Sequence, residues 1–259
     1  MKRIIFPARK TTRILFLILG ILVVLHLFVA FCHLVLHVRV GALTELVDLD
    51  LESNLPTFFN ALLFFVGSAL LYLHGRVGDA KQGKGWTTMA LIFVFLGLDE
   101  GSQIHEKFMG FTQRLLARGQ IGEEAGSWLL NAWVVPYVLA LGVLAFILWR
   151  WFWRLAPSLR KGLLISGGVY VFGAVGMEMA GSKLIATLPG QDASAFPWLP
   201  CDLYGDPSGC WLFMEPRYIL LYTLEEVGEM TGLILCIRTL LRHFEANGTQ
   251  LSLSLTRAE

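Results

Sequence analysis

Long apolar runs recur six times along the 259-residue chain and are separated by shorter polar segments. A helix needs roughly 20 apolar residues to cross a hydrocarbon core of ~30 Å, and each run has about that length. The pattern predicts an all-α fold, a six-helix transmembrane bundle that forms a single domain. We expect the spans at about residues 14–37, 56–74, 87–106, 130–149, 162–183 and 217–237.

Composition supports this class. Apolar residues make up 55% of the chain, charged residues only 16%, and the mean hydropathy is +0.61. Soluble domains usually carry about a quarter of charged residues. A net charge of +1 gives no basic excess of the kind that nucleic-acid binding requires. We therefore expect the lipid bilayer, and no nucleic acid, as a partner.

Lysine and arginine are distributed unevenly between the two sides of the predicted bundle. If the segments alternate sides, fifteen lie on the side of the termini and six lie on the other. Because positive residues collect on the cytoplasmic side, we expect both termini to be cytoplasmic, in a multi-pass protein of a bacterial cytoplasmic membrane. The first apolar run is longer than the core of a signal peptide, which predicts an uncleaved first span.

One outer feature follows from this orientation. Cys201 and Cys210 lie nine positions apart in the outer loop 184–216, where a disulfide bond is stable outside the cytoplasm. The pair therefore predicts a disulfide, and two unpaired thiols are the alternative. The polar tail at about 245–259 is expected to be disordered.

Seven of the twenty acidic residues fall inside a predicted span or at its rim. A charge at the centre of a bilayer costs about 2.5–3.5 kcal/mol on insertion scales, so each of these groups needs a partner, a proton, a metal or water. Pairing with Lys183 or Arg217 in a packed bundle is the simplest alternative to a functional site. The seven are Asp99, Glu100, Glu106, Glu178, Glu225, Glu226 and Glu229.

Helical spacing collects several of these side chains on common faces. In the sixth span, Tyr222 and the three glutamates that follow it have the i, i+3, i+4, i+7 pattern of one helix face. His26, His33 and His37 are spaced i, i+7, i+11, which predicts one stripe on the first span. With ~1.5 Å of rise per residue, four spans bring ionisable groups to one layer in the outer half of the membrane.

Carboxylate and imidazole ligands suit iron, manganese or zinc, and these are the expected cofactors. The sequence therefore predicts a metal-dependent membrane enzyme, a hydrolase or an oxidoreductase, that acts on a lipid or another apolar substrate. Tyr222 and Glu226 are the candidate catalytic groups that move protons. The candidate metal ligands are Asp99, Glu178, Glu225, Glu229, His26 and His33, and the candidate outer mouth consists of His37, His105 and Glu106.

Two other functions fit the same residues. Carboxylates and histidines that extend from the middle of the membrane to its outer surface are typical of a transporter for protons or a divalent cation. The segments "LDEG" and "LEEVGE" occupy corresponding places in the two three-helix halves, as inverted repeats would. The third function is that of a non-catalytic subunit of a membrane complex, in which the buried charges fix the helix register.

Overall fold

The computed structural model describes residues 2–77, 82–105, 107, 133–204, 209–248 and 252–255. These residues are helical apart from the connecting loops and one two-stranded ribbon. The expected all-helical class is therefore confirmed for the part of the chain that the structure describes.

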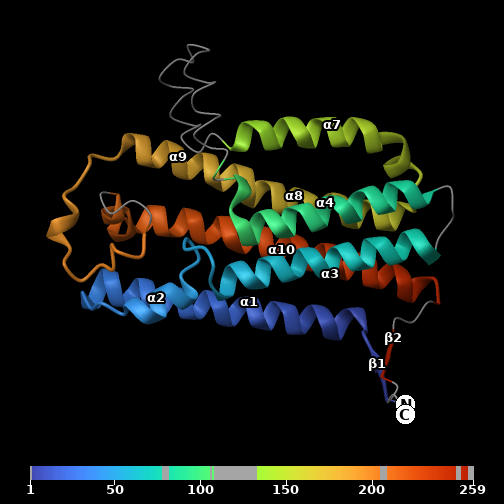
Figure 1. The fold of residues 1–259 in the computed structure, drawn as a ribbon, viewed down its shortest axis with the longest axis horizontal. Helices are drawn as coiled ribbons and strands as arrows, with labels where there is room; N and C mark the ends of the chain where they lie inside the picture. Colours follow the sequence, from blue (N-terminus) through green and yellow to red (C-terminus); the bar gives the residue numbers. More distant parts are fainter. Residues whose placement is uncertain are drawn as a thin grey trace.

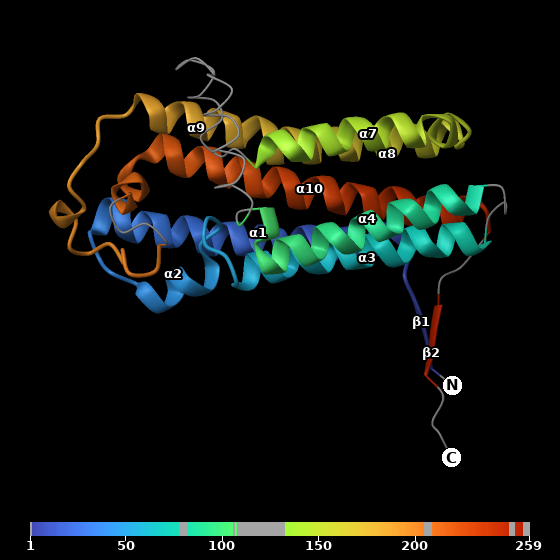
Figure 2. The same cartoon turned by 45° about the horizontal axis from the view of Figure 1, so that its top comes forward.

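The long helical segments lie side by side along the longest axis of the molecule (Figures 1 and 2). Shorter elements are α2 (Gly41–Val47), the 3₁₀ turns η4 (Ala193–Ala195) and η5 (Cys210–Met214), and the strands β1 (Lys2–Ile5) and β2 (Ser252–Leu255). The long segments are α1 (Ala8–Phe31) with its π-helical extension η1 (Cys32–Leu36), α3 (Leu55–Val77), α4 (Gly83–Ser102), α7 (Val134–Trp153), the continuous series α8 (Pro157–Val171), η3 (Phe172–Met177) and α9 (Glu178–Thr187), and α10 (Pro216–Ala246).

Four of these segments are long and apolar enough to cross a membrane: Ala8–Leu36, Leu55–Val77, Val134–Trp153 and Pro157–Thr187. This supports a membrane protein by length and composition. Helices α4 and α10 fall outside this set because they carry the carboxyl groups that lower their hydropathy. Their polar residues face other helices, as described below.

Helix α10 occupies the centre of the bundle and packs against α1, α3 and α8. Its side chains Met230, Ile234 and Leu240 are fully buried, so the helix has apolar neighbours on several sides. Helix α7 lies at the periphery (Figure 1) and exposes large apolar side chains, such as Phe146 at 85%. Exposed apolar side chains of this kind are suited to contact with lipid.

The π-helical segment η1 changes the direction of the histidines on the first span. His26 and His33 are buried, whereas His37 is exposed and has a φ of 54° at the end of η1. A π-helical turn contains an additional residue, so it rotates the residues that follow it relative to an α-helix. The prediction of one histidine stripe is therefore wrong for His37.

The two ends of the described chain meet. Strands β1 and β2 pair antiparallel, with Lys2 opposite Leu255. The tail that was expected to be disordered from about residue 245 instead contains the last turn of α10 and strand β2. The ribbon lies at one end of the bundle (Figures 1 and 2), so the chain begins and ends at the same end.

Glycines bring the segment α8–η3 into backbone contact with α10. A Cβ atom on Gly173 would lie 2.7 Å from the carbonyl oxygen of Glu225 and 2.9 Å from the amide nitrogen of Glu229. On the facing helix, a Cβ atom on Gly228 would lie 3.0 Å from the Cα atom of Gly173. The absence of side chains at this crossing allows the helices to approach closely, as small residues do in membrane proteins.

Substitution of Gly173 by Ala is expected to lower the free energy of unfolding by about 1–3 kcal/mol, because the added methyl group overlaps the backbone of α10. The measurement is the midpoint of thermal unfolding in detergent. Gly168 lies on the same helical segment with no neighbour within 4 Å of its Cβ position, so Gly168→Ala is the matched control. Equal losses in both variants would contradict the proposed contact.

Candidate functional site

An acidic loop between α2 and α3 forms the outer part of the site. Asp48 is 2% exposed, and its carboxylate accepts hydrogen bonds from the hydroxyl of Tyr204 (3.1 Å) and the backbone N–H of Asp50 (3.1 Å). The side-chain amide of Asn54 donates to the carbonyl oxygen of Asp48 (2.6 Å) and holds the loop in place. Sequence reasoning missed this loop, although its acids alternate with leucines in "DLDLE" and no Lys or Arg occurs between Arg39 and Arg76.

His26 connects this loop to α10. The hydroxyl of Thr223 donates to the carbonyl oxygen of Ile219 (2.6 Å), so it accepts from Nε2–H of His26 (3.1 Å). The other ring nitrogen, Nδ1, accepts from the backbone N–H of Leu49 (3.3 Å). Both nitrogens of this fully buried ring are therefore used within the protein. Such an imidazole is neutral and fixes the position of the loop against α10.

Tyr222 lies beside His26 on the same side of α10. The two rings meet edge to face with their centroids 5.4 Å apart, and the tyrosine hydroxyl hydrogen-bonds with Asp48. One turn earlier, the hydroxyl of Tyr218 donates to Asp50 (3.3 Å). Two tyrosines of α10 thus supply neutral donors to the acidic loop.

Asn60 joins three helices in the centre of the site. It lies on α3 and is fully buried, and its amide Nδ2 donates to Glu100 of α4 (3.0 Å) and to Glu229 of α10 (3.2 Å). Its Oδ1 atom has no hydrogen-bond partner among the described residues. The sequence contains a signal for this residue, since a lone Asn in an apolar span usually has a polar partner inside the bundle.

Further carboxyl groups surround this junction. Glu178 begins α9 directly after η3, and its carboxyl group lies beside that of Glu225. Two neighbouring carboxylates repel each other when both are charged. The charged neighbours of Glu226 are other carboxyl groups, including Glu229, Glu100 and Glu52. The structure therefore brings together five of the acids that the sequence placed on the predicted third, fifth and sixth spans: Glu100, Glu178, Glu225, Glu226 and Glu229.

Asp99 has a separate set of contacts on the side of α7. Its carboxylate accepts from the hydroxyl of Tyr137 (2.6 Å) and from the backbone N–H of His105 (2.8 Å), and Nδ1 of His105 lies 3.4 Å away. The left-handed conformation of Gln103 turns the chain at the end of α4 and brings His105 back to Asp99. Glu106, the third residue of the expected outer mouth, lies outside the described residues.

The remaining histidines have protein contacts of their own. The hydroxyl of Thr44 donates to the carbonyl oxygen of Val40 (3.1 Å) and so accepts from Nε2–H of His33 (3.3 Å). His37 stacks on Trp198, with 4.4 Å between ring centroids. Within the described ranges, no three His, Cys, Asp or Glu side chains are placed to hold one metal ion. The predicted ligands thus lie in one polar region without converging on a point.

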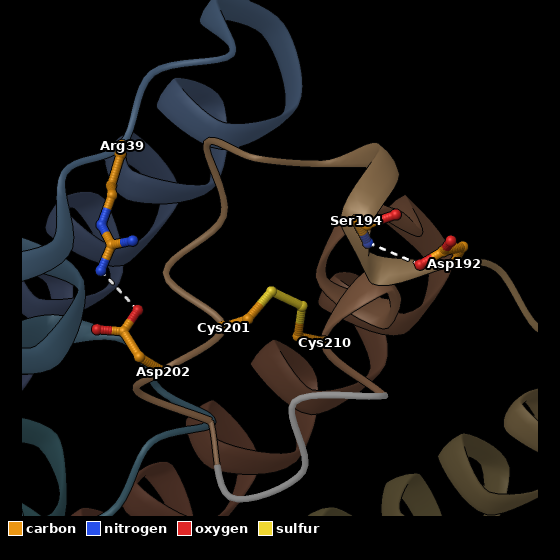
Figure 3. The surroundings of a disulfide bond; sticks show 6 residues. All are labelled: Arg39, Asp192, Ser194, Cys201, Asp202 and Cys210. Atoms are coloured by element: carbon orange, nitrogen blue, oxygen red, sulfur yellow. Dashed lines mark hydrogen bonds and ion pairs between the residues drawn. A yellow bond between two sulfur atoms is a disulfide. The ribbon is translucent and has the colours of Figure 1, made fainter.

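The predicted disulfide between Cys201 and Cys210 is present, with 5.5 Å between the Cα atoms (Figure 3). Asp202, the neighbour of one cysteine, forms an ion pair with Arg39. Tyr204 lies between the two cysteines in the sequence and reaches Asp48. The disulfide therefore closes the short outer segment that supplies a donor to the acidic loop.

Burial determines the electrostatics of the acidic loop. It raises the pKa of Asp48, although the hydrogen bonds from Asp50 and Tyr204 partly oppose this effect. Burial also raises the pKa of Asp50 well above its usual value, and the nearby charges of Asp48 and Glu178 raise it further. The loop therefore favours carboxyl groups that hold their protons at a higher pH than exposed aspartates do.

Asp50→Asn is expected to flatten the dependence of stability on pH. The pKa of Asp50 is raised on folding, so the folded chain binds more protons and its stability falls as pH rises above about 4. Asn cannot ionise and still accepts from Tyr218, so the variant should unfold at a higher temperature than the wild type at neutral pH. Each unit by which folding raises the pKa of Asp50 corresponds to about 1.4 kcal/mol in the free energy of unfolding.

The measurement is the midpoint of thermal unfolding in detergent, taken from about pH 4 to neutral pH. Asp192 is the control because it is exposed and its pKa is lowered by hydrogen bonds from Ser194 (Figure 3). Asp192→Asn should have the opposite sign, with stability lost at neutral pH. A curve for Asp50→Asn that runs parallel to the wild-type curve would contradict the assignment.

No curated protein and no solved structure matches this sequence. A family model described as "Domain of unknown function (DUF8692)" matches residues 14–244. The match includes all the carboxyl groups of the site that the structure describes. It also covers the long helical segments described above, apart from the first residues of α1 and the last two of α10. The chain belongs to this family of domains of unknown function, DUF8692.

Proposed function

We propose that the chain is a proton-translocating membrane protein in which six helices cross the bilayer and both termini are cytoplasmic. The observation that carries this proposal is the buried junction at Asn60, where carboxyl groups of α4 and α10 share one amide donor. The neighbouring carboxyl groups of Glu178 and Glu225 support it. Such a group of acids inside a membrane is stable only when protons or cations neutralise it.

The arrangement of the helices supports this topology. Strands β1 and β2 pair with each other, as is expected when the segments before the first span and after the last lie on the same side of the membrane. Helices α4 and α10 run alongside the four apolar segments (Figure 1), and their carboxyl groups contact Asn60 rather than lipid. Together with the uneven distribution of Lys and Arg, this supports six spans and a cytoplasmic location of the termini.

The donors that hold the acids favour proton movement over permanent ion pairing. The donors to Asp48, Asp50, Glu100 and Glu229 are hydroxyl or amide groups, which leave each carboxyl group able to gain or lose a proton. Charged neighbours continue from the junction to the acidic loop, since Glu226 lies near both Glu100 and Asp50. In this proposal, Tyr222 and Glu226 are relay groups between the junction and the outer surface.

A metal-dependent enzyme is the other function that the sequence predicts. Iron, manganese or zinc would need at least three ligands around one point. The described residues do not offer such a group, and His26 and His33 donate to threonines instead. The arrangement therefore gives more support to protons than to a bound metal.

Proton flux into liposomes tests the proposal. The wild-type chain, reconstituted with a pH-sensitive dye inside, should dissipate an imposed pH gradient. Glu229→Gln should slow the flux by about tenfold, which corresponds to ~1.4 kcal/mol in the barrier, because Gln accepts from Asn60 but cannot carry a proton. Glu45→Gln is the control, since Glu45 is an exposed acid on α2 and should leave the flux unchanged.

The same preparations separate the alternatives. Wild-type flux in Glu229→Gln, or no flux in the wild type, would overturn the proposal. Elemental analysis could instead find one iron, manganese or zinc ion per wild-type chain and none in Glu229→Gln. That result would overturn the proposal in favour of the metal-dependent enzyme. A folded, metal-free wild type without flux would leave the buried acids with the structural role of a complex subunit.

A further inference from the structure

A cavity of about 310 Å³ lies at the opposite end of the bundle from the carboxyl groups. The first turn of α4 and the last turn of α7 form its walls, with Lys84, Gly85 and Thr88 on one side and Arg150, Trp151 and Arg154 on the other. Both helix ends lie at the end of the molecule that carries the β ribbon (Figures 1 and 2). The cavity is therefore at the predicted cytoplasmic surface of the membrane.

A close contact between the two helices forms the base of this cavity. A Cβ atom on Gly85 would lie 2.3 Å from the indole ring of Trp151, so only glycine leaves room for this ring. The ring also meets Trp86 edge to face, with 5.0 Å between centroids. Among the described residues, no group accepts a hydrogen bond from its buried Nε1–H.

The cavity carries positive charge. Lys84, Arg150 and Arg154 are exposed, and none of the three has a carboxylate within ion-pair distance among the described residues. Gln82 precedes α4 without capping it through its side chain, so the first N–H groups of the helix add partial positive charge. Three cations and a helix N-terminus at one cavity favour an anion that accepts several hydrogen bonds.

The surroundings identify the source of this anion. The cavity wall also includes Ile147 and Leu148 on α7, the helix whose side chains are largely exposed to lipid. A phosphate group at this position could be continuous with acyl chains that lie along α7. Basic pockets between helices at the cytoplasmic side of a membrane recognise anionic headgroups in this way. The cavity thus has a polar part for a phosphate and an apolar part for a chain.

We propose that this cavity binds the phosphate headgroup of an anionic phospholipid, with Lys84, Arg150 and Arg154 as ligands. The arginines present planar donor groups to the phosphate oxygens. The bound lipid joins the first turn of α4 to the last turn of α7. The proposal involves none of the carboxyl groups of the outer site and stands independently of proton translocation.

Native mass spectrometry of the full-length chain in detergent tests this, after removal of endogenous lipid. Phosphatidylglycerol is the anionic probe and phosphatidylcholine is the neutral one. We expect the wild type to bind phosphatidylglycerol about tenfold more tightly than phosphatidylcholine. The triple variant Lys84→Gln, Arg150→Gln and Arg154→Gln should lose this preference.

A matched triple variant controls for total charge. Arg9, Lys10 and Arg13 are three exposed cations at the same end of the bundle but outside the cavity. Their replacement by Gln should leave the preference for phosphatidylglycerol unchanged. A preference retained by the cavity variant, or lost equally in the control variant, would overturn the proposal. If inorganic phosphate alone competes as well as phosphatidylglycerol does, the site binds free phosphate and the assignment to a lipid fails.

Discussion

The need to provide hydrogen-bond partners for buried carboxyl groups constrains the half of this protein that lies away from the β ribbon. Asn60 and Glu229 are buried where α3, α4 and α10 meet, so a carboxyl group there depends on donors from another helix. Asn60 supplies two such donors from α3, and Tyr137 supplies one from α7 to Asp99. These bonds connect helices that are far apart in the sequence. The polar site and the tertiary structure of the bundle therefore have the same physical origin.

The sequence predicts the parts of this arrangement that follow from local patterns. Apolar length locates the long helices, and loop composition predicts the disulfide at Cys201 and Cys210. The helical period correctly places Glu225 and Glu229 on a face that meets other helices. These features depend only on the spacing of residue types along one segment.

Other parts depend on tertiary contacts and could not be read from the spacing. Asp48 belongs to the site because a loop folds inward onto His26, whereas loop residues are normally assigned to solvent. The π-helical turn before His37 moves that residue off the expected stripe, and the α-helical period contains no information about it. The hydroxyl groups of Thr223 and Thr44, which bind the histidines, carry no charge and gave no signal. In each case the missing information was the partner on another segment.

The glycine contact between η3 and α10 has a mechanical consequence. Because Gly173 and Gly228 bring two backbones together, no side chain separates the helices at this crossing. We therefore expect the series α8–η3–α9 and α10 to move as one rigid unit. Asn60 lies on the boundary between this unit and the pair of helices α3 and α4. Its hydrogen bond to Glu100 stays within that pair, whereas its hydrogen bond to Glu229 crosses the boundary. A relative displacement of the two units would break the bond to Glu229 first and would separate that acid from Glu100.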